Sequence, residues 1–157
     1  MFHRWAALVL VLALCAMSPK NAAGQTQSQQ PRGHGAGGLG VNYPNPFNPT
    51  TTIPFSVGDA NCTDGSAQHV VSIRILNVLA QPVVVPVLVG GVANTASVPK
   101  SLNGAPINNL SLGCGSYAAF WSGLVTRTGR KAASGVYAVQ LFVDKVLVAT
   151  TKIYYAK

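Results

Sequence analysis

Residues 42–57 read Asn-Tyr-Pro-Asn-Pro-Phe-Asn-Pro-Thr-Thr-Thr-Ile-Pro-Phe-Ser-Val and combine two backbone signals. A residue that precedes proline is restricted toward extended geometry, so residues 42–49 are predicted to form an irregular extended segment. The alternating Thr, Ile, Phe and Val side chains that follow are typical of a β-strand over residues 51–57. Pro54 removes one backbone donor, which predicts that this strand lies at a sheet edge or carries a bulge. The segment therefore indicates the start of a β-rich domain.

Short strands separated by turns continue to the C-terminus. Apolar and polar alternation predicts further strands over residues 69–78, 81–89, 116–122, 136–143 and 146–155. Residues 90–116 are rich in Asn, Gly and Ser and are predicted to be a loop with one short strand near residues 107–112. Asp144 and Lys145 are predicted to form the tight turn of the last hairpin, at a sheet edge. Seven or so strands of this kind predict an antiparallel β-sandwich. Its predicted core includes Ile73, Phe120, Trp121 and Tyr137.

The N-terminus has the layout of a secretory signal peptide over residues 1–24. A short basic start precedes an apolar run over residues 5–17, and small side chains occupy residues 22–24. The apolar run is shorter than the roughly 20 residues of a membrane-spanning helix. A lipid anchor on Cys15 is an alternative, which the bulky Leu14 before it disfavours. We expect cleavage after residue 24, export of the chain, and no transmembrane segment afterwards.

Residues 25–41 are rich in Gln and Gly and contain few apolar side chains. Such a composition does not offset the entropy of ordering the chain, so these residues are predicted to be a flexible linker. One β-sandwich domain over residues 42–157 is expected to follow. The chain of 157 residues is long enough for one domain with a sizeable core.

The overall composition favours an ordered core and a basic surface. Hydrophobic residues make up 48% of the chain and charged residues 9%, so disorder throughout is not expected. Loss of Arg4 and Lys20 with the signal peptide would leave nine basic residues against three aspartates, and there is no glutamate. A basic surface can attract acidic polymers such as surface polysaccharide. The charges are scattered rather than arranged in a stripe, so no nucleic-acid partner is expected.

The exported chain would keep two cysteines, Cys62 and Cys114. An even number of cysteines in an oxidising compartment predicts one structural disulfide. The alternative is a reactive thiol, which needs a nearby base or cation. The two histidines of the exported chain, His34 and His69, show no recognisable spacing to either cysteine. A disulfide between the two cysteines is therefore the favoured prediction.

Groups that could perform catalysis are scarce in this sequence. An enzyme needs an acid, a base, a nucleophile or a metal at a shared site, and three aspartates with two histidines are a thin inventory. His69 begins a predicted strand, where an ordinary half-packed histidine is expected rather than a general base. Residues 59–65 are rich in Asp and Asn but lack the spacing of a calcium loop. We expect no enzymatic activity, no cofactor and no metal site.

Four segments carry a family resemblance, together with the basic C-terminal end: residues 43–53, 75–83, 121–123 and 129–137. Segment by segment, they are similar to the type A C-terminal sorting domains of the bacterial type IX secretion system. The resemblance covers residues 42–157. Ala80 stands where the family usually has Gly, and Ser122 replaces the acid of a Trp-Asp-Gly turn. The loops that hold the two cysteines are longer than is usual in the family.

This resemblance implies both a fold and a cellular destination. The family is related to the Ig-like domain of the flagellar hook-capping protein, which implies an Ig-like sandwich. It also implies that the outer-membrane protein-export machinery recognises the domain, with passage through the periplasm followed by secretion or display at the cell surface. The residues that match positions of the sorting signal are Gly135, Tyr137, Lys152 and Lys157. A tight turn, a core aromatic and two solvated lysines are the structural alternatives for these four.

Sorting domains are normally tails of larger proteins, whereas only the predicted signal peptide and linker precede the domain here. Two other functions therefore stay open. One is a stand-alone extracellular adhesion or binding module on the same fold. The other is a remnant of a larger secreted protein that lost its cargo.

Overall fold

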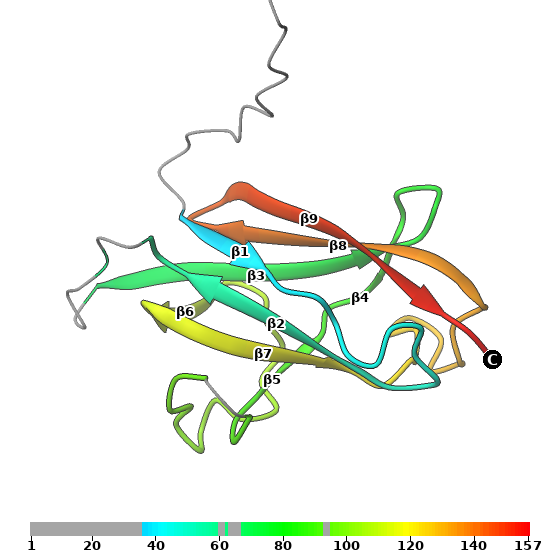
Figure 1. Ribbon diagram of the computed structural model, residues 1–157, viewed down its shortest axis with the longest axis horizontal. Coiled ribbons are helices and arrows are strands. Elements are labelled where there is room, and N and C mark those ends of the chain that lie inside the picture. Colours follow the sequence, from blue (N-terminus) through cyan, green and yellow to red (C-terminus); the bar gives the residue numbers. More distant parts are fainter. Residues whose placement is uncertain (1–35, 60–61, 63–66, 93–94) are drawn as a thin grey trace, which may run out of the picture. The chain divides into compact units, whose positions relative to one another are not determined.

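The structure is a computed structural model that describes residues 36–59, 62, 67–92 and 95–157. These residues form nine β-strands and no helix, arranged as two antiparallel sheets (Figure 1). The predicted antiparallel β-sandwich is confirmed, with nine strands in place of about seven. The predicted signal peptide and most of the predicted linker lie outside the described residues. The described part of the chain contains no helix long and apolar enough to cross a membrane.

The first sheet has the strand order β1-β2-β7-β5. Its strands are β1 (Gly37–Leu39), β2 (Thr51–Val57), β7 (Gly115–Trp121) and β5 (Val87–Val89). β2 pairs with β7 along its whole length, and β1 covers the other side of β2 near its end. The two longest strands, β2 and β7, therefore form the centre of this sheet.

The second sheet has the strand order β4-β3-β8-β9, and β6 pairs with the first half of β3. Its strands are β3 (Gln68–Leu76), β4 (Pro82–Val84), β6 (Leu110–Gly113), β8 (Gly135–Val143) and β9 (Val146–Tyr155). β9 lies at the sheet edge, as predicted for the last hairpin. The turn residues Asp144 and Lys145 have φ angles of 52° and 68°, which match the type I′ turn that suits a two-residue hairpin.

The predicted edge position of residues 51–57 is wrong, because the end of the predicted linker supplies a further strand. Gly37–Leu39 forms β1, and the N–H of Gly40 donates to the carbonyl oxygen of Pro54 at 2.8 Å. The N–H and C=O of one strand residue face the same neighbour, so the missing donor of Pro54 faces the end of β1 rather than β7. Pro54 therefore costs no hydrogen bond in the β2–β7 ladder.

Two other predicted strands have different bounds. Residues 81–89 are divided between the sheets, because β4 pairs with β3 and β5 pairs with β7. Pro86 lies between them, and its carbonyl oxygen accepts the N–H of Ile107 at 2.9 Å. The short strand predicted near residues 107–112 is β6, which begins at Leu110, while Ile107 is buried outside it.

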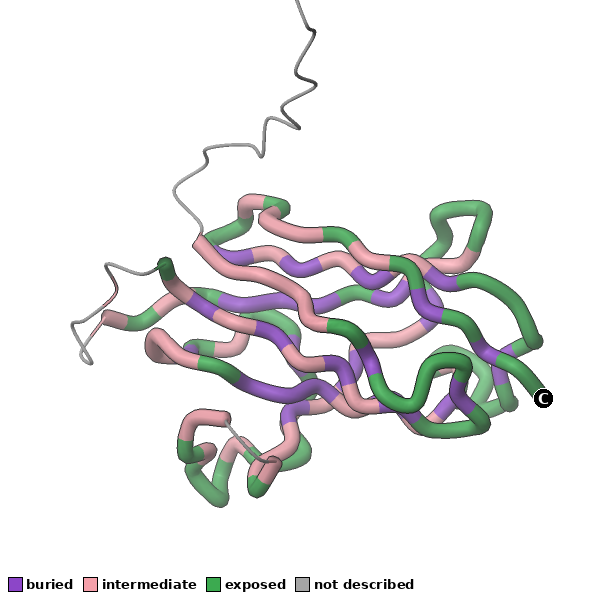
Figure 2. Tube along the Cα trace, viewed as in Figure 1, coloured by how far each residue is buried: buried purple, intermediate pink, exposed green. Residues whose placement is uncertain are grey.

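The two sheets bury one apolar core between them (Figure 2). Every second residue of β2 is buried, which is the pattern of a strand with one face in the core. Among the predicted core residues, Ile73, Trp121 and Tyr137 are buried. Phe120 is only partly buried, because it alternates with Trp121 along β7 and faces away from the core.

The opening segment before β2, residues 42–49, packs against β9 and the C-terminal end of the chain. The N–H of Phe47 donates to the carbonyl oxygen of Tyr154 at 2.9 Å, and the N–H of Ala156 donates to the carbonyl oxygen of Phe47 at 3.1 Å. The ring of Phe47 is 1% exposed and stacks on Tyr155 with 4.9 Å between centroids. The backbone of this segment bends at residues 44–46 and 48–49 rather than running extended as predicted, and it places one aromatic anchor against β9.

Candidate recognition groove and cysteine–histidine cluster

The four predicted recognition residues gather at one end of the β8–β9 hairpin. Gly135 lies opposite Tyr155 at the start of β8, and Tyr137 follows two residues later. Lys152 lies on β9 opposite Ala138 and is exposed. The N–H of Lys157 donates to Oγ of Ser134 at 3.2 Å, which holds the chain end beside the start of β8.

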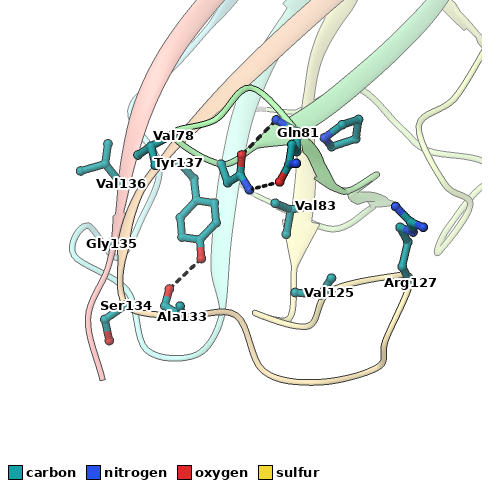
Figure 3. Close-up of a pocket in the computed structure, with 12 residues that line it drawn as sticks. Val78, Gln81, Val83, Val125, Arg127, Ala133, Ser134, Gly135, Val136 and Tyr137 are labelled. Atoms are coloured by element: carbon teal, nitrogen blue, oxygen red, sulfur yellow. Dashed lines mark hydrogen bonds between the residues drawn. The ribbon is translucent and has the colours of Figure 1, made fainter.

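A groove of about 540 Å³ opens at this end of the second sheet (Figure 3). Three segments line it: the β3–β4 connection with β4, the loop after β7, and the start of β8. The apolar residues of the lining include Val78, Val83, Val125, Val136 and Tyr137, and in the view Val136 lies on the opposite side of β8 from the Tyr137 ring. The lining contains one cation, Arg127, and no carboxylate. The groove therefore suits an apolar segment of a partner better than a cationic one.

Asn77 shapes one wall of the groove. Its Oδ1 accepts the N–H groups of Leu79 at 3.0 Å and Gln81 at 2.9 Å, and its Nδ2 donates to Oε1 of Gln81 at 3.0 Å. This turn leaves Val78 79% exposed and Leu79 73% exposed, which is unusual for such large apolar side chains. Ala80 has a φ of 57°, a left-handed value that favours the glycine expected there from the resemblance.

Tyr137 forms the floor of the groove. Its ring packs edge-on against Trp121 with 5.2 Å between centroids, and its hydroxyl donates to the carbonyl oxygen of Ala133 at 2.7 Å. Burial raises the pKa of Tyr137, and the neighbouring Tyr155 adds to this effect while the hydrogen bond to Ala133 opposes it. Tyr137 is thus a neutral, buried donor, and its predicted alternative as a core aromatic matches its place.

Gly123 positions the loop that forms the second wall. It has a φ of 75°, and a Cβ at this position would collide with the carbonyl oxygen of Pro49. Its own carbonyl oxygen accepts the N–H of Ala132 at 2.8 Å, and Nε1 of Trp121 donates to the carbonyl oxygen of Leu124 at 2.9 Å. The turn at residues 121–123 is therefore held by hydrogen bonds of the Gly123 backbone and the Trp121 indole.

We expect Gly123→Ala to lower the free energy of unfolding by about 1–3 kcal/mol, because a left-handed residue and a backbone collision both disfavour a side chain. Urea unfolding of the purified variant measures this change. Gly129→Ala is the matched control, since Gly129 has a φ of 64° but no atom within 4 Å of an added Cβ. Equal losses for the two variants would contradict the proposed role of the Pro49 contact.

The second cluster lies at the connections between the sheets. The structure places Cys62 and Cys114 at disulfide distance, bonded through their Sγ atoms with Cα atoms 6.0 Å apart, which agrees with the predicted pairing. Cys62 lies in the connection from β2 to β3, and Cys114 lies between β6 and β7. Both connections pass from one sheet to the other, so the disulfide joins the two crossings.

His69 lies beside this disulfide, which the sequence did not predict. Its Nε2 is 3.7 Å from Sγ of Cys62 and 3.8 Å from Sγ of Cys114. Its Nδ1 is 2.7 Å from Oδ2 of Asp144, while Oδ1 of Asp144 accepts the N–H of Val70 at 2.9 Å. The hydrogen bond with His69 lowers the pKa of Asp144, and the N–H of Val70 adds to this against the opposing effect of burial.

His69 is half-packed near the start of β3, as expected, but it also contacts both cysteine sulfur atoms, which the sequence did not indicate. Spacing along the chain could not indicate this cluster. His69 lies on β3, whereas Cys62, Cys114 and Asp144 lie in three different connections between strands. The register of β3 against β6 and β8 creates the cluster, with His69 opposite Leu112 and Val71 opposite Val143. His34, the other histidine, lies outside the described residues.

Comparison with known proteins leaves the family of this chain open. No protein-family model matches the chain, and no curated protein matches it. Among solved structures, the chain is similar to the alkylpurine DNA glycosylase AlkC of Pseudomonas fluorescens bound to DNA containing an abasic site analog, with a TM-score of 0.39 and 13% identity. The match covers 77% of this chain and 30% of that one, and at this TM-score it carries no argument about function.

Proposed function

We propose that this protein is an exported, non-enzymatic recognition domain that the outer-membrane protein-export machinery binds, as its resemblance to type IX sorting domains implies. The observation that supports this proposal most is the convergence of separate motifs on one groove. Residues 75–83 and 129–137 are far apart in sequence and both line the groove, and the N–H of Lys157 holds the C-terminal end against the lining residue Ser134. A groove built from the motifs that carry the resemblance is a natural place for partner recognition.

The exposed apolar wall gives the groove an energetic basis for binding. Removal of apolar surface from water is favourable by about 25 cal/mol per Å², and the excess of this gain over the costs of association stabilises a complex. Val78, which lines the groove, and its neighbour Leu79, which lies outside the lining, are both held out by the Asn77 turn and are largely exposed. A partner segment that contacts them would remove this surface from water. Arg127 at the groove would add attraction for an anionic group on the partner.

Truncation is a poor test of the proposed function. Removal of residues 152–157 would delete Ile153 and Tyr155, which are 0% and 3% exposed, together with the hydrogen bonds between β9 and Phe47. Such a variant would lose export because it loses the fold. Exposed single substitutions separate recognition from folding.

We expect Val78→Asp to abolish delivery of the tagged full-length protein to the cell surface, because it places a charge on the apolar wall. The free energy of unfolding should change by no more than about 0.5 kcal/mol, since the side chain is exposed. Val41→Asp is the matched control, because Val41 and Val78 are both 79% exposed and Val41 does not line the groove. The measurement is the fraction of protein outside the cell in strains with and without the export system.

Equal delivery of both variants and wild type would contradict recognition through the groove, and delivery independent of the export system would contradict the proposed function as a whole. The alternative of an adhesion or binding module predicts a different result. In that case the purified domain would retain a surface polysaccharide or a glycoprotein in a pull-down. The Val78→Asp variant would then reach the cell surface like the wild-type protein.

A further inference from the structure

Two connections and the start of strand β3 bring metal-ligand atoms together at the sheet crossings. Sγ of Cys62, Sγ of Cys114 and Nε2 of His69 all lie within 4.8 Å of one another. Each of the three residues is partly buried, so the cluster is screened from solvent without being closed to it. In the oxidised form the two sulfur atoms are bonded to each other.

The positions of these atoms match a tetrahedral soft-metal site. Zn–S bonds of about 2.3 Å and Zn–N bonds of about 2.05 Å place ligand atoms about 3.6 Å apart for N and S and about 3.8 Å apart for two S atoms. Nε2 of His69 already lies 3.7 and 3.8 Å from the two sulfur atoms. The two Sγ atoms must still move apart. The Cα atoms are 6.0 Å apart, so rotation of the two cysteine side chains can separate the sulfur atoms.

Asp144 gives His69 the orientation that a metal ligand requires. Metal-binding histidines commonly donate the other ring N–H to a carboxylate, which fixes the ring and its tautomer. Nδ1 of His69 lies 2.7 Å from Oδ2 of Asp144, so the lone pair of Nε2 faces the two sulfur atoms. Asp144 is itself fixed by the N–H of Val70 and by the I′ turn between β8 and β9.

We propose that reduction of the Cys62–Cys114 disulfide converts this cluster into a Zn²⁺ site with ligands Cys62, Cys114 and His69. A dithiol reductant attacks the protein disulfide by thiol–disulfide exchange and becomes a cyclic disulfide, while both cysteines become thiols. Zn²⁺ then displaces one proton from each thiol and binds two thiolates and the neutral Nε2. Water occupies the fourth position, as in other three-ligand zinc sites. An organic disulfide reverses the sequence, since it takes the two electrons, re-forms the Cys62–Cys114 bond and releases Zn²⁺.

The test is a titration of the purified full chain with Co²⁺, which reports tetrahedral thiolate coordination by its visible and near-ultraviolet bands. After reduction with a phosphine, we expect one Co²⁺ per chain with the spectrum of a tetrahedral site, and displacement of Co²⁺ by added Zn²⁺. The oxidised chain should show no such spectrum. Asp144→Asn should weaken Zn²⁺ binding by about 10–100-fold, because it removes the partner that orients His69.

Two variants decide whether the histidine belongs to the site. His69→Ala should lose the three-ligand spectrum, whereas Lys145→Asn, a change in the same turn as Asp144, should bind metal like wild type. Unchanged Co²⁺ spectra and affinity for His69→Ala would overturn the proposal. Circular dichroism of the reduced chain tests whether reduction unfolds the domain. If it does, added Zn²⁺ should restore the β-sheet signal. Failure to restore this signal would also overturn the proposal.

Discussion

Replacement of Cys62 and Cys114 by alanine is expected to lower the free energy of unfolding by about 4 kcal/mol. The two cysteines are separated by 52 positions, and in the chain-entropy model a loop of this length corresponds to about 4 kcal/mol at 25 °C. The effect should be large for this domain, because typical domains have a total stability of only about 5–15 kcal/mol. Guanidinium unfolding of the double variant and of oxidised wild type measures the difference.

The position of the disulfide explains why its loss should act on the whole sandwich. Cys62 follows β2 of the first sheet and precedes β3 of the second, and Cys114 links β6 of the second sheet to β7 of the first. The bond therefore holds together the two places where the chain changes sheets. Reduced wild type with a metal chelator is the control and should match the double variant. A loss below about 1 kcal/mol in both would show that core packing alone fixes these crossings.

The fold class could be predicted because a strand with one buried face shows alternating apolar and polar residues in the sequence. Val71, Ile73 and Ile75 alternate along β3, and all three are fully buried. The hairpin turn at Asp144 and Lys145 was equally visible, because turn residues and strand residues differ in type. These signals depend on near neighbours in the sequence, so they need no knowledge of which strands pair.

Strand β1 could not be predicted for the opposite reason. Gly37 and Gly38 have no side chain to show alternation, and their composition is that of a linker. In the structure a Cβ on Gly37 would lie 2.6 Å from the carbonyl oxygen of Ser56, so close approach of two backbones requires glycine there. That requirement exists only after β2 is in place. The presence of β1 beside β2 is also the reason why Pro54 lies inside the sheet rather than at its edge.

Both candidate sites depend on tertiary contacts in the same way. The motifs around the groove were recognised one at a time, but their meeting at one end of the second sheet follows from the pairing of β3 with β4 and β8. The cysteine–histidine cluster was missed altogether. Its histidine and its carboxylate are separated by 75 positions, a distance at which sequence spacing contains no information.

Phe47→Ala is expected to lower the free energy of unfolding by about 3–5 kcal/mol, the usual cost of removing a buried phenylalanine ring. The ring is 1% exposed and lies 5.1 Å from Trp121 and 4.9 Å from Tyr155 between centroids. Alanine would leave a cavity where the opening segment, β7 and β9 meet. Denaturant unfolding followed by tryptophan fluorescence measures the loss, because Trp121 borders the cavity.

Two variants test whether Phe47 acts through packing of its ring. Phe47→Leu fills part of the cavity and should cost less than Phe47→Ala, whereas Tyr43→Ala in the same segment should cost less than about 1 kcal/mol, since Tyr43 is 48% exposed. Trp121 also packs against Tyr137, so the cavity lies directly behind the groove floor. Phe47→Ala at a temperature where it stays folded should therefore weaken partner binding at the groove, while Tyr43→Ala should not. A small loss of stability for Phe47→Ala would mean that the hydrogen bonds between residue 47 and β9, rather than the ring, hold the opening segment in place.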